Sequence, residues 1–191
     1  ADGDEFRALA MQGRLPRSLR GAYPVLAVPN SLGRSRPGDE DVLDLFDPLY
    51  GAAMGEGEEA ADDDLLRSGR TTIETLRKLE EILSSAPAGQ EVAYPSEAGR
   101  LGAQLKKTAR VLKAGRGLEI VGVDWNGWDH HINEGGGGET DVIRTRLDTL
   151  GTALATFYED IQFMKNMVTT VIMTEFGRTN RENGNSGTDH G

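Results

Sequence analysis

The sequence predicts an α/β fold built on a mostly parallel sheet. Three apolar runs, at residues 23–29, 118–123 and 168–174, have the composition of strands, and helical periodicity separates the last two. The two later runs are almost continuously apolar, which is typical of strands covered on both faces. With 191 residues the chain is long enough to bury a sizeable core, so we expect residues 1–191 to form a single domain.

The N-terminal part predicts short elements. Residues 6–20 carry apolar side chains followed by three arginines around Pro16, which favours a short helix and then a basic loop. Turn residues bound the apolar run at 23–29, as expected of a strand. Acidic and apolar residues alternate at 41–50, which predicts another short helix ended by Asp-Pro.

The longer helices are predicted from apolar residues spaced three or four apart. In the first of them, Ile73, Leu76 and Leu79 fall on one face. The segments with this periodicity are residues 65–84, 96–114 and 141–164. Glycine- and asparagine-rich sequence after residue 174 predicts a loop.

Composition excludes several classes of function. The formal charge of −10 argues against non-specific binding to nucleic acid, which requires a basic surface. The chain contains no cysteine, so disulfides and thiolate metal sites are excluded. No apolar stretch approaches the length needed to cross a membrane, and we expect no membrane span.

All three histidines follow aspartates in two short clusters. Asp129 precedes His130 and His131, and Asp189 precedes His190. Carboxylate oxygens and neutral imidazole nitrogens are the donors that zinc, manganese or iron prefer. Each cluster comes after a predicted strand, and ligands of such sheets bind beyond the carboxyl ends of the strands. We therefore expect the two clusters to converge on one metal site.

The first cluster limits which side chains can act together. Asp129 and His131 are two residues apart, so they face the same side only if the segment is extended, and His130 then points away. Asp124, at the end of the strand predicted at 118–123, is a reserve ligand. The alternative is a polar loop whose histidines only hydrogen-bond to the backbone.

The second cluster suits a site with two metal ions. Adjacent Asp189 and His190 can each donate to one of two neighbouring ions, which lie about 4 Å apart in such sites. Arg178, close behind the strand predicted at 168–174, is a candidate for holding an anionic ester. The four glycines at 135–138 lack the Lys and Ser/Thr of a phosphate-binding loop, so we expect a flexible loop there.

Three motifs resemble a known family. Residues 171–179 (Val-Ile-Met-Thr-Glu-Phe-Gly-Arg-Thr) and 187–191 (Gly-Thr-Asp-His-Gly) resemble the signature of the bacterial proteins labelled domain of unknown function 1501. Residues 127–131 are similar to that family's Gly-Trp-Asp-Thr-His, with His130 in place of Thr. Residues 6–9 and 16–21 are also similar to its middle region.

The family is grouped with the alkaline phosphatase and sulfatase superfamily. The resemblance implies a three-layer α/β/α fold, hydrolysis of small anionic phosphate or sulfate esters, and export to the periplasm. It implies a two-metal site at the strand ends, with zinc, manganese or calcium as the divalent ion. Asp189 and His190 correspond to the ligands of one metal, and Asp129 and His131 to those of the other, with Asp124 in reserve.

The same resemblance implies that residues 1–191 are an incomplete domain. In the superfamily the nucleophile comes from an N-terminal strand, so we expect it upstream of residue 1, and a last histidine ligand is expected beyond Gly191. Two alternatives remain. One is a non-catalytic exported binding or structural protein that keeps the fold. In the other, the Asp and His pairs hold loops together by hydrogen bonds without metal. The sequence does not indicate an oligomeric state.

Overall fold

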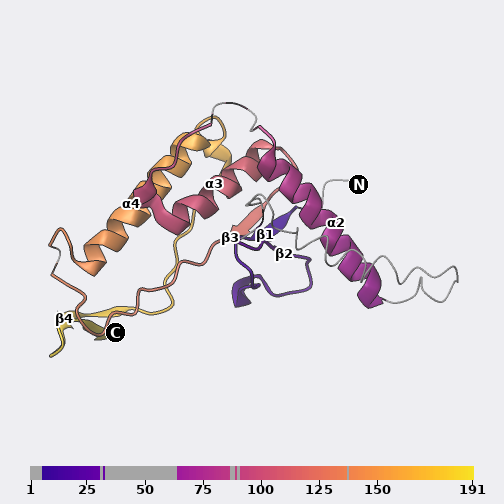
Figure 1. The fold of residues 1–191 in the computed structure, drawn as a ribbon. Helices are drawn as coiled ribbons and strands as arrows, with labels where there is room; N and C mark the ends of the chain where they lie inside the picture. Colours follow the sequence, from indigo (N-terminus) through magenta and orange to yellow (C-terminus); the bar gives the residue numbers. More distant parts are fainter. Residues whose placement is uncertain (1–5, 31, 33–63, 87–88, 90, 137) are drawn as a thin grey trace, which may run out of the picture. The chain divides into compact units, whose positions relative to one another are not determined.

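The computed structural model describes residues 6–30, 32, 64–86, 89, 91–136 and 138–191 (Figure 1). The chain divides into two compact units. The first comprises Ala1–Gly89 with Arg110–Val123, and the second comprises Gln90–Ala109 with Asp124–Gly191. The helix Gly99–Lys113 therefore belongs to both units: residues 99–109 lie in the second unit and residues 110–113 in the first.

A parallel three-stranded sheet organises the first unit. Its strands are β1 (Ala8–Ala10), β2 (Leu26–Ala27) and β3 (Ile120–Gly122), in the order β2-β1-β3. Leu9 of the central strand lies opposite Leu26 on one side and Val121 on the other. The predicted α/β class is confirmed, as are the strands expected at 23–29 and 118–123.

The helix predicted within residues 6–20 is wrong. The segment forms strand β1 and then a short 3-10 helix, η1 (Arg17–Leu19). All three residues of β1 are buried, as expected of a central strand with apolar neighbours on both faces. A short apolar run does not by itself distinguish helix from strand, and pairing with two partners decides the outcome here. The helix predicted at 41–50 lies outside the described residues.

The longer predicted helices all form. They are α2 (Asp64–Ser84), α3 (Gly99–Lys113), which the 3-10 helix η3 (Ser96–Ala98) precedes, and α4 (Val142–Asp160). Leu76, Leu79 and Leu83 of α2 join Leu9 and Val111 in the buried core of the first unit. Each such side chain contributes about 1.5–3 kcal/mol on burial, so the core holds α2 against the sheet. No described helix has the length and apolar character required to cross a membrane.

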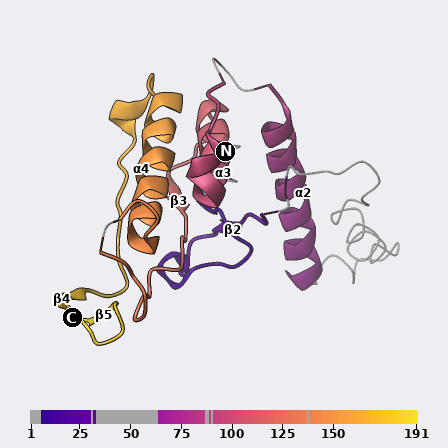
Figure 2. The ribbon, with the colours of Figure 1, turned by 60° about the vertical axis from the view of Figure 1, so that its left-hand side comes forward.

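Two helical segments form the scaffold of the second unit. Helix α4 lies beside the first part of α3 (Figure 2), and its side chains Ala153 and Phe157 are buried. The hydroxyl of Tyr94 donates to Asp160 Oδ2 at 3.2 Å and ties the segment before η3 to the end of α4. Burial raises the pKa of Tyr94 far above its usual value, and the nearby Asp160 carboxylate adds to the effect.

An antiparallel hairpin replaces the loop expected after residue 174. Its strands are β4 (Arg178–Glu182) and β5 (Thr188–His190), and Arg178 lies opposite His190. The side-chain oxygen of Asn183 accepts from the backbone N–H groups of Asn185 and Gly187, at 2.9 and 3.2 Å, and so closes the turn. Asparagine stabilises turns in this way, which polar composition alone does not distinguish from an open loop.

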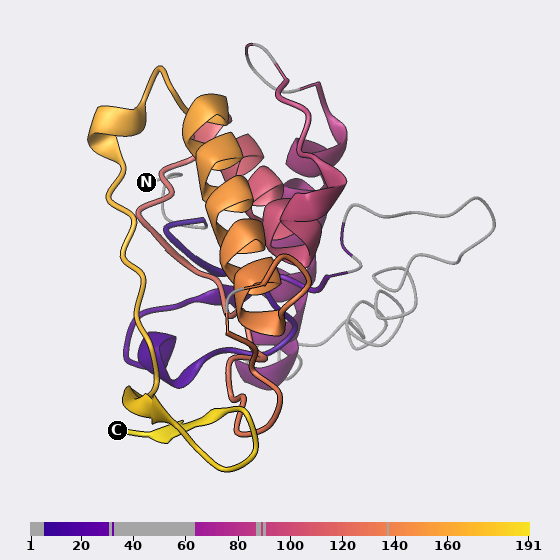
Figure 3. The same ribbon diagram turned by 90° about the vertical axis from the view of Figure 1, so that its left-hand side faces the viewer.

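The strand predicted at 168–174 does not form. After the 3-10 helix η4 (Lys165–Met167) the chain runs extended to β4 (Figure 3), and the backbone of 169–176 makes no hydrogen bond to any described residue. Val171, Ile172 and Met173 are 60–79% exposed. β-Branched residues favour an extended backbone, but a strand also needs a partner for its N–H and C=O groups.

Candidate metal site

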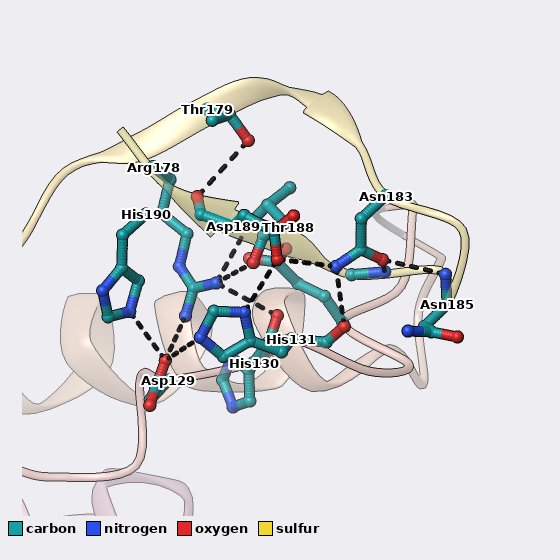
Figure 4. A network of polar contacts seen from close by, with 12 residues as sticks. Asp129, His130, His131, Arg178, Thr179, Asn183, Asn185, Thr188, Asp189 and His190 are labelled. Atoms are coloured by element: carbon teal, nitrogen blue, oxygen red, sulfur yellow. Dashed lines mark hydrogen bonds and ion pairs between the residues drawn. The ribbon is translucent and has the colours of Figure 1, made fainter.

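The loop that carries the first cluster lies along the hairpin that carries the second. The N–H of Thr188 donates to His130 O at 3.3 Å, and the N–H groups of Asn133 and Glu134 donate to the turn between β4 and β5 at 3.0 and 2.8 Å. Figure 4 shows the side chains of Asp129, His131, Asp189 and His190 close together beside the hairpin. The two clusters therefore converge, but through the hairpin and not through the ends of two strands in one sheet.

Three side chains form a compact group of potential ligands. Asp129 Oδ1 lies 3.0 Å from His131 Nε2 and 3.0 Å from His190 Nε2. The ligand atoms of the three residues all lie within 4.8 Å of one another, and the two imidazole centroids are 4.9 Å apart. Hydrogen bonding to His190 is the main reason why the pKa of Asp129 is held below its usual value.

Asp189 lies behind this group. Its Oδ1 is 2.9 Å from His131 Nδ1 and also accepts from the side-chain amide of Asn183 at 3.1 Å. The bond from His131 Nδ1 leaves Nε2 free to donate its lone pair towards the group, as in the carboxylate–histidine–metal arrangement of many metal sites. Hydrogen bonding to His131 also holds the pKa of Asp189 low. Asp189, which was predicted as a ligand, thus lies against His131 and outside the group of three.

Two other residues lie outside the group: His130, which was expected to point away, and Asp124, the reserve ligand. His130 contributes its backbone oxygen, while its Nδ1 is buried without a hydrogen-bond partner among the described residues. Asp129 and His131 both face the group, although the His130 N–H donates to Trp128 O at 3.1 Å and so makes a tight turn there instead of the expected extended backbone. Asp124 is not a member of the ligand group.

Arg178 braces the loop. Its Nη2 donates to Trp128 O at 2.7 Å and to Asp129 Oδ1 at 3.3 Å, while its Nη1 donates to His130 O at 3.1 Å and to Thr188 O. The side chain is 19% exposed. Both terminal nitrogens of Arg178 thus bind protein oxygens. The arginine predicted to bind substrate therefore holds the loop that carries Asp129 and His131.

Gly187 permits the close approach of hairpin and loop. It is buried, and a Cβ at this position would collide with the backbone carbonyl group of His131. Gly184, three residues earlier in the same turn, has open space around it. The sequence contains both glycines without showing which one is required.

Arg146 supports the loop from the other side. It projects from α4, donates to Asn126 O at 3.1 Å, and its Cζ lies 5.6 and 5.8 Å from the rings of Trp125 and Trp128. Gly127 has a φ of 95° and faces this guanidinium, which leaves no room for a side chain. Charged residues on the polar face of a helix give no sequence signal of such a role.

The structure thus defines an α/β protein that carries a cluster of aspartates and histidines on a loop and a hairpin. The family model described as "Protein of unknown function (DUF1501)" matches residues 83–191, which include the whole cluster. This is more than half of the chain, so the chain belongs to that family. The similar segments at 6–9 and 16–21 lie outside the matched residues. Searches of curated proteins and of solved structures give no match.

Proposed function

We propose that this protein binds a divalent metal ion through Asp129, His131 and His190 and hydrolyses phosphate or sulfate esters. The observation that carries the proposal is the position of Asp129 Oδ1, 3.0 Å from an Nε2 of each imidazole. One carboxylate and two imidazoles form a three-ligand set of the kind found in catalytic zinc sites, where further positions stay open for water and substrate.

The donor set favours zinc or manganese over calcium, which takes six to eight oxygen ligands. When bound, such an ion supplies Lewis-acid stabilisation of the negative charge that develops on the ester oxygens. The residues of this chain hold the site: Asp189 orients His131, and Arg178 fixes the backbone around Asp129. A second metal ion would require Asp189 to exchange its bond to His131 for a metal bond.

The proposal extends to the fold and the location. The parallel sheet, and the resemblance carried by residues 171–179 and 187–191, support a three-layer α/β/α architecture of the alkaline phosphatase and sulfatase type. Export to the periplasm rests on the family resemblance alone. A small anionic ester as substrate follows from the same resemblance.

A non-catalytic protein that keeps the same site is the second candidate. The hydroxyls of Thr188 and Thr179, both next to the cluster, are already engaged with Glu134 and with the backbone of Asp189, at 2.6 and 3.3 Å. The Asp and His side chains also satisfy one another by hydrogen bonds. Both facts favour a protein in which the cluster binds metal without turnover, or holds the loop without metal.

Metal binding is tested first, with a matched pair of neighbouring histidines. Zinc and manganese affinities are measured by competition with a chromophoric chelator, and metal content by elemental analysis, for the wild type, His131→Gln and His130→Gln. We expect His131→Gln to lose at least about tenfold in affinity, the lower end of what outer-shell changes alone cost. His130→Gln should bind as the wild type does. Equal metal content in all three proteins would leave the hydrogen-bonded loop as the explanation.

Catalysis is tested with the same substitutions in the full-length protein. Aryl phosphate and aryl sulfate substrates are assayed with zinc or manganese present. The proposal expects turnover of at least one ester class by the wild type and by His130→Gln, and its loss in His131→Gln. Metal binding together with background rates on both esters would support the non-catalytic candidate.

A further inference from the structure

An aromatic ring that the metal proposal does not use lies against one of its ligands. Phe176 lies two residues before the start of β4, and its ring stacks on the His190 imidazole with centroids 4.0 Å apart and planes 15° apart. The side chain of His190 is 46% exposed, and besides Phe176 it contacts Asp129 and the His131 ring. Stacking against a flat ring favours one orientation of the imidazole plane over the others.

The same ring also contacts the residue that braces the loop. Arg178 Cζ lies 5.1 Å from the centroid of Phe176, within the range of a cation–π interaction. Arg178 donates in turn to Asp129 Oδ1 at 3.3 Å. Phe176 therefore contacts His190 directly and is linked to Asp129 through Arg178. These two proposed ligands come from separate segments of the chain.

We infer that Phe176 is a positioning residue, which holds the His190 imidazole with Nε2 towards Asp129 and so prepares the site for a metal ion. The inference rests on the proposed function, because it assigns a purpose to that same site. Phe176 carries no donor atom and acts by removing alternative orientations of the histidine. Supporting residues of this kind set the precision of a metal site, and their loss typically costs 10–100-fold in affinity.

Metal affinity separates this role from simple packing. Zinc binding is measured by chelator competition for the wild type, Phe176→Leu, Phe176→Tyr and the control Phe163→Leu, whose side chain is 63% exposed. Phe176→Leu keeps apolar bulk without a ring, so we expect affinity to fall about tenfold. Phe176→Tyr keeps the ring and should restore binding, and Phe163→Leu should bind as the wild type does.

A second readout requires no metal, and its first measurement needs only the wild type. In the metal-free wild type, the ring current of Phe176 should shift the His190 ring protons upfield, and NMR of histidine-labelled protein measures this. The shift should vanish in Phe176→Leu and remain in Phe176→Tyr. Its absence from the wild type overturns the inference, as does wild-type zinc affinity in Phe176→Leu.

The two proposals fail in different ways. A wild type that binds zinc with an affinity unchanged in Phe176→Leu removes the role of Phe176 and leaves the metal site standing. A wild type that binds no zinc removes the metal site, and with it the role of Phe176 in metal binding. The ring-current measurement then still decides whether the phenylalanine holds His190.

Discussion

Two neighbouring segments of the second unit reverse what their compositions favour. Residues 168–174 are rich in β-branched residues, yet they stay unpaired and exposed. Strands β4 and β5 consist mostly of polar and charged residues, yet they form a hairpin that carries half of the candidate site. The better strand formers are thus outside a sheet, and the poorer ones are within one.

Pairing partners explain the difference. The hairpin closes on itself through Asn183, and Arg178 and Thr188 then attach it to the ligand loop. Residues 169–174 make no backbone hydrogen bond to a described residue, and propensity alone is worth too little to fix a strand. The site therefore depends on a polar network, and its members should be far more sensitive to substitution than the apolar segment.

The largest effect is expected where hairpin and loop approach most closely. In Gly187→Ala, the new Cβ cannot fit against the His131 backbone, so the hairpin must leave the loop. We expect zinc affinity to fall on the order of a hundredfold, the upper end of what misplaced support costs. Gly184→Ala, in the open part of the turn, is the control and should bind normally. Unchanged affinity in Gly187→Ala would show that the hairpin does not rest on the loop.

Arg178→Met comes next. It removes the donor that satisfies Trp128 O and one of the two donors to His130 O, and a carbonyl left unsatisfied costs about 1–3 kcal/mol. We expect the free energy of unfolding, measured by urea denaturation, to fall by about 2 kcal/mol, because water replaces part of the lost hydrogen bonding. Arg181→Met changes an exposed arginine of the same strand and should cost little. Equal losses in the two variants would contradict the bracing role.

The stability that Tyr94 and Asp160 give to the second unit should decrease at alkaline pH. The pKa of Tyr94 is raised in the folded protein by burial and by Asp160, so the unfolded chain ionises first, near pH 10. The contribution of Tyr94 is therefore complete below pH 10 and is lost as pH rises towards the folded pKa. We expect stability to fall above pH 10 in the wild type and to fall less in Tyr94→Phe. Parallel curves from denaturation at pH 8 to 11 would refute this.

The smallest effect is expected in the apolar segment. Ile172→Thr changes an exposed side chain and should alter the free energy of unfolding by no more than about 0.5 kcal/mol. The same substitution at the fully buried Ile161 should cost at least about 2 kcal/mol, because it buries a hydroxyl and loses packing. A large loss from Ile172→Thr would mean that residues 168–174 are packed in solution.

The sequence predicts the elements in which the spacing of apolar side chains indicates the secondary structure and the buried face. The stripe of α2 belongs to this class, whereas α4 and β3 form as predicted although Leu147 and Ile120 are more than half exposed. It also predicts that His131 and His190 meet, although the expected route through two strand ends is not the one observed. Roles that depend on backbone contacts were missed: Gly187 by its closeness to a carbonyl, and Arg178 by the carbonyls it binds. Such contacts are set by tertiary geometry, and residue type alone does not encode them.

The directions of the Asp189 and His190 side chains depend on the number of residues in the hairpin turn that precedes them. Successive side chains of a strand leave it on opposite sides, so each of these two residues reaches its own partner only in the present register. Inserting or deleting one residue between Asn183 and Gly187 would rotate both away while leaving every donor atom in the sequence. Natural variation among relatives should therefore tolerate exchanges at the tip of this turn far better than changes in its residue count.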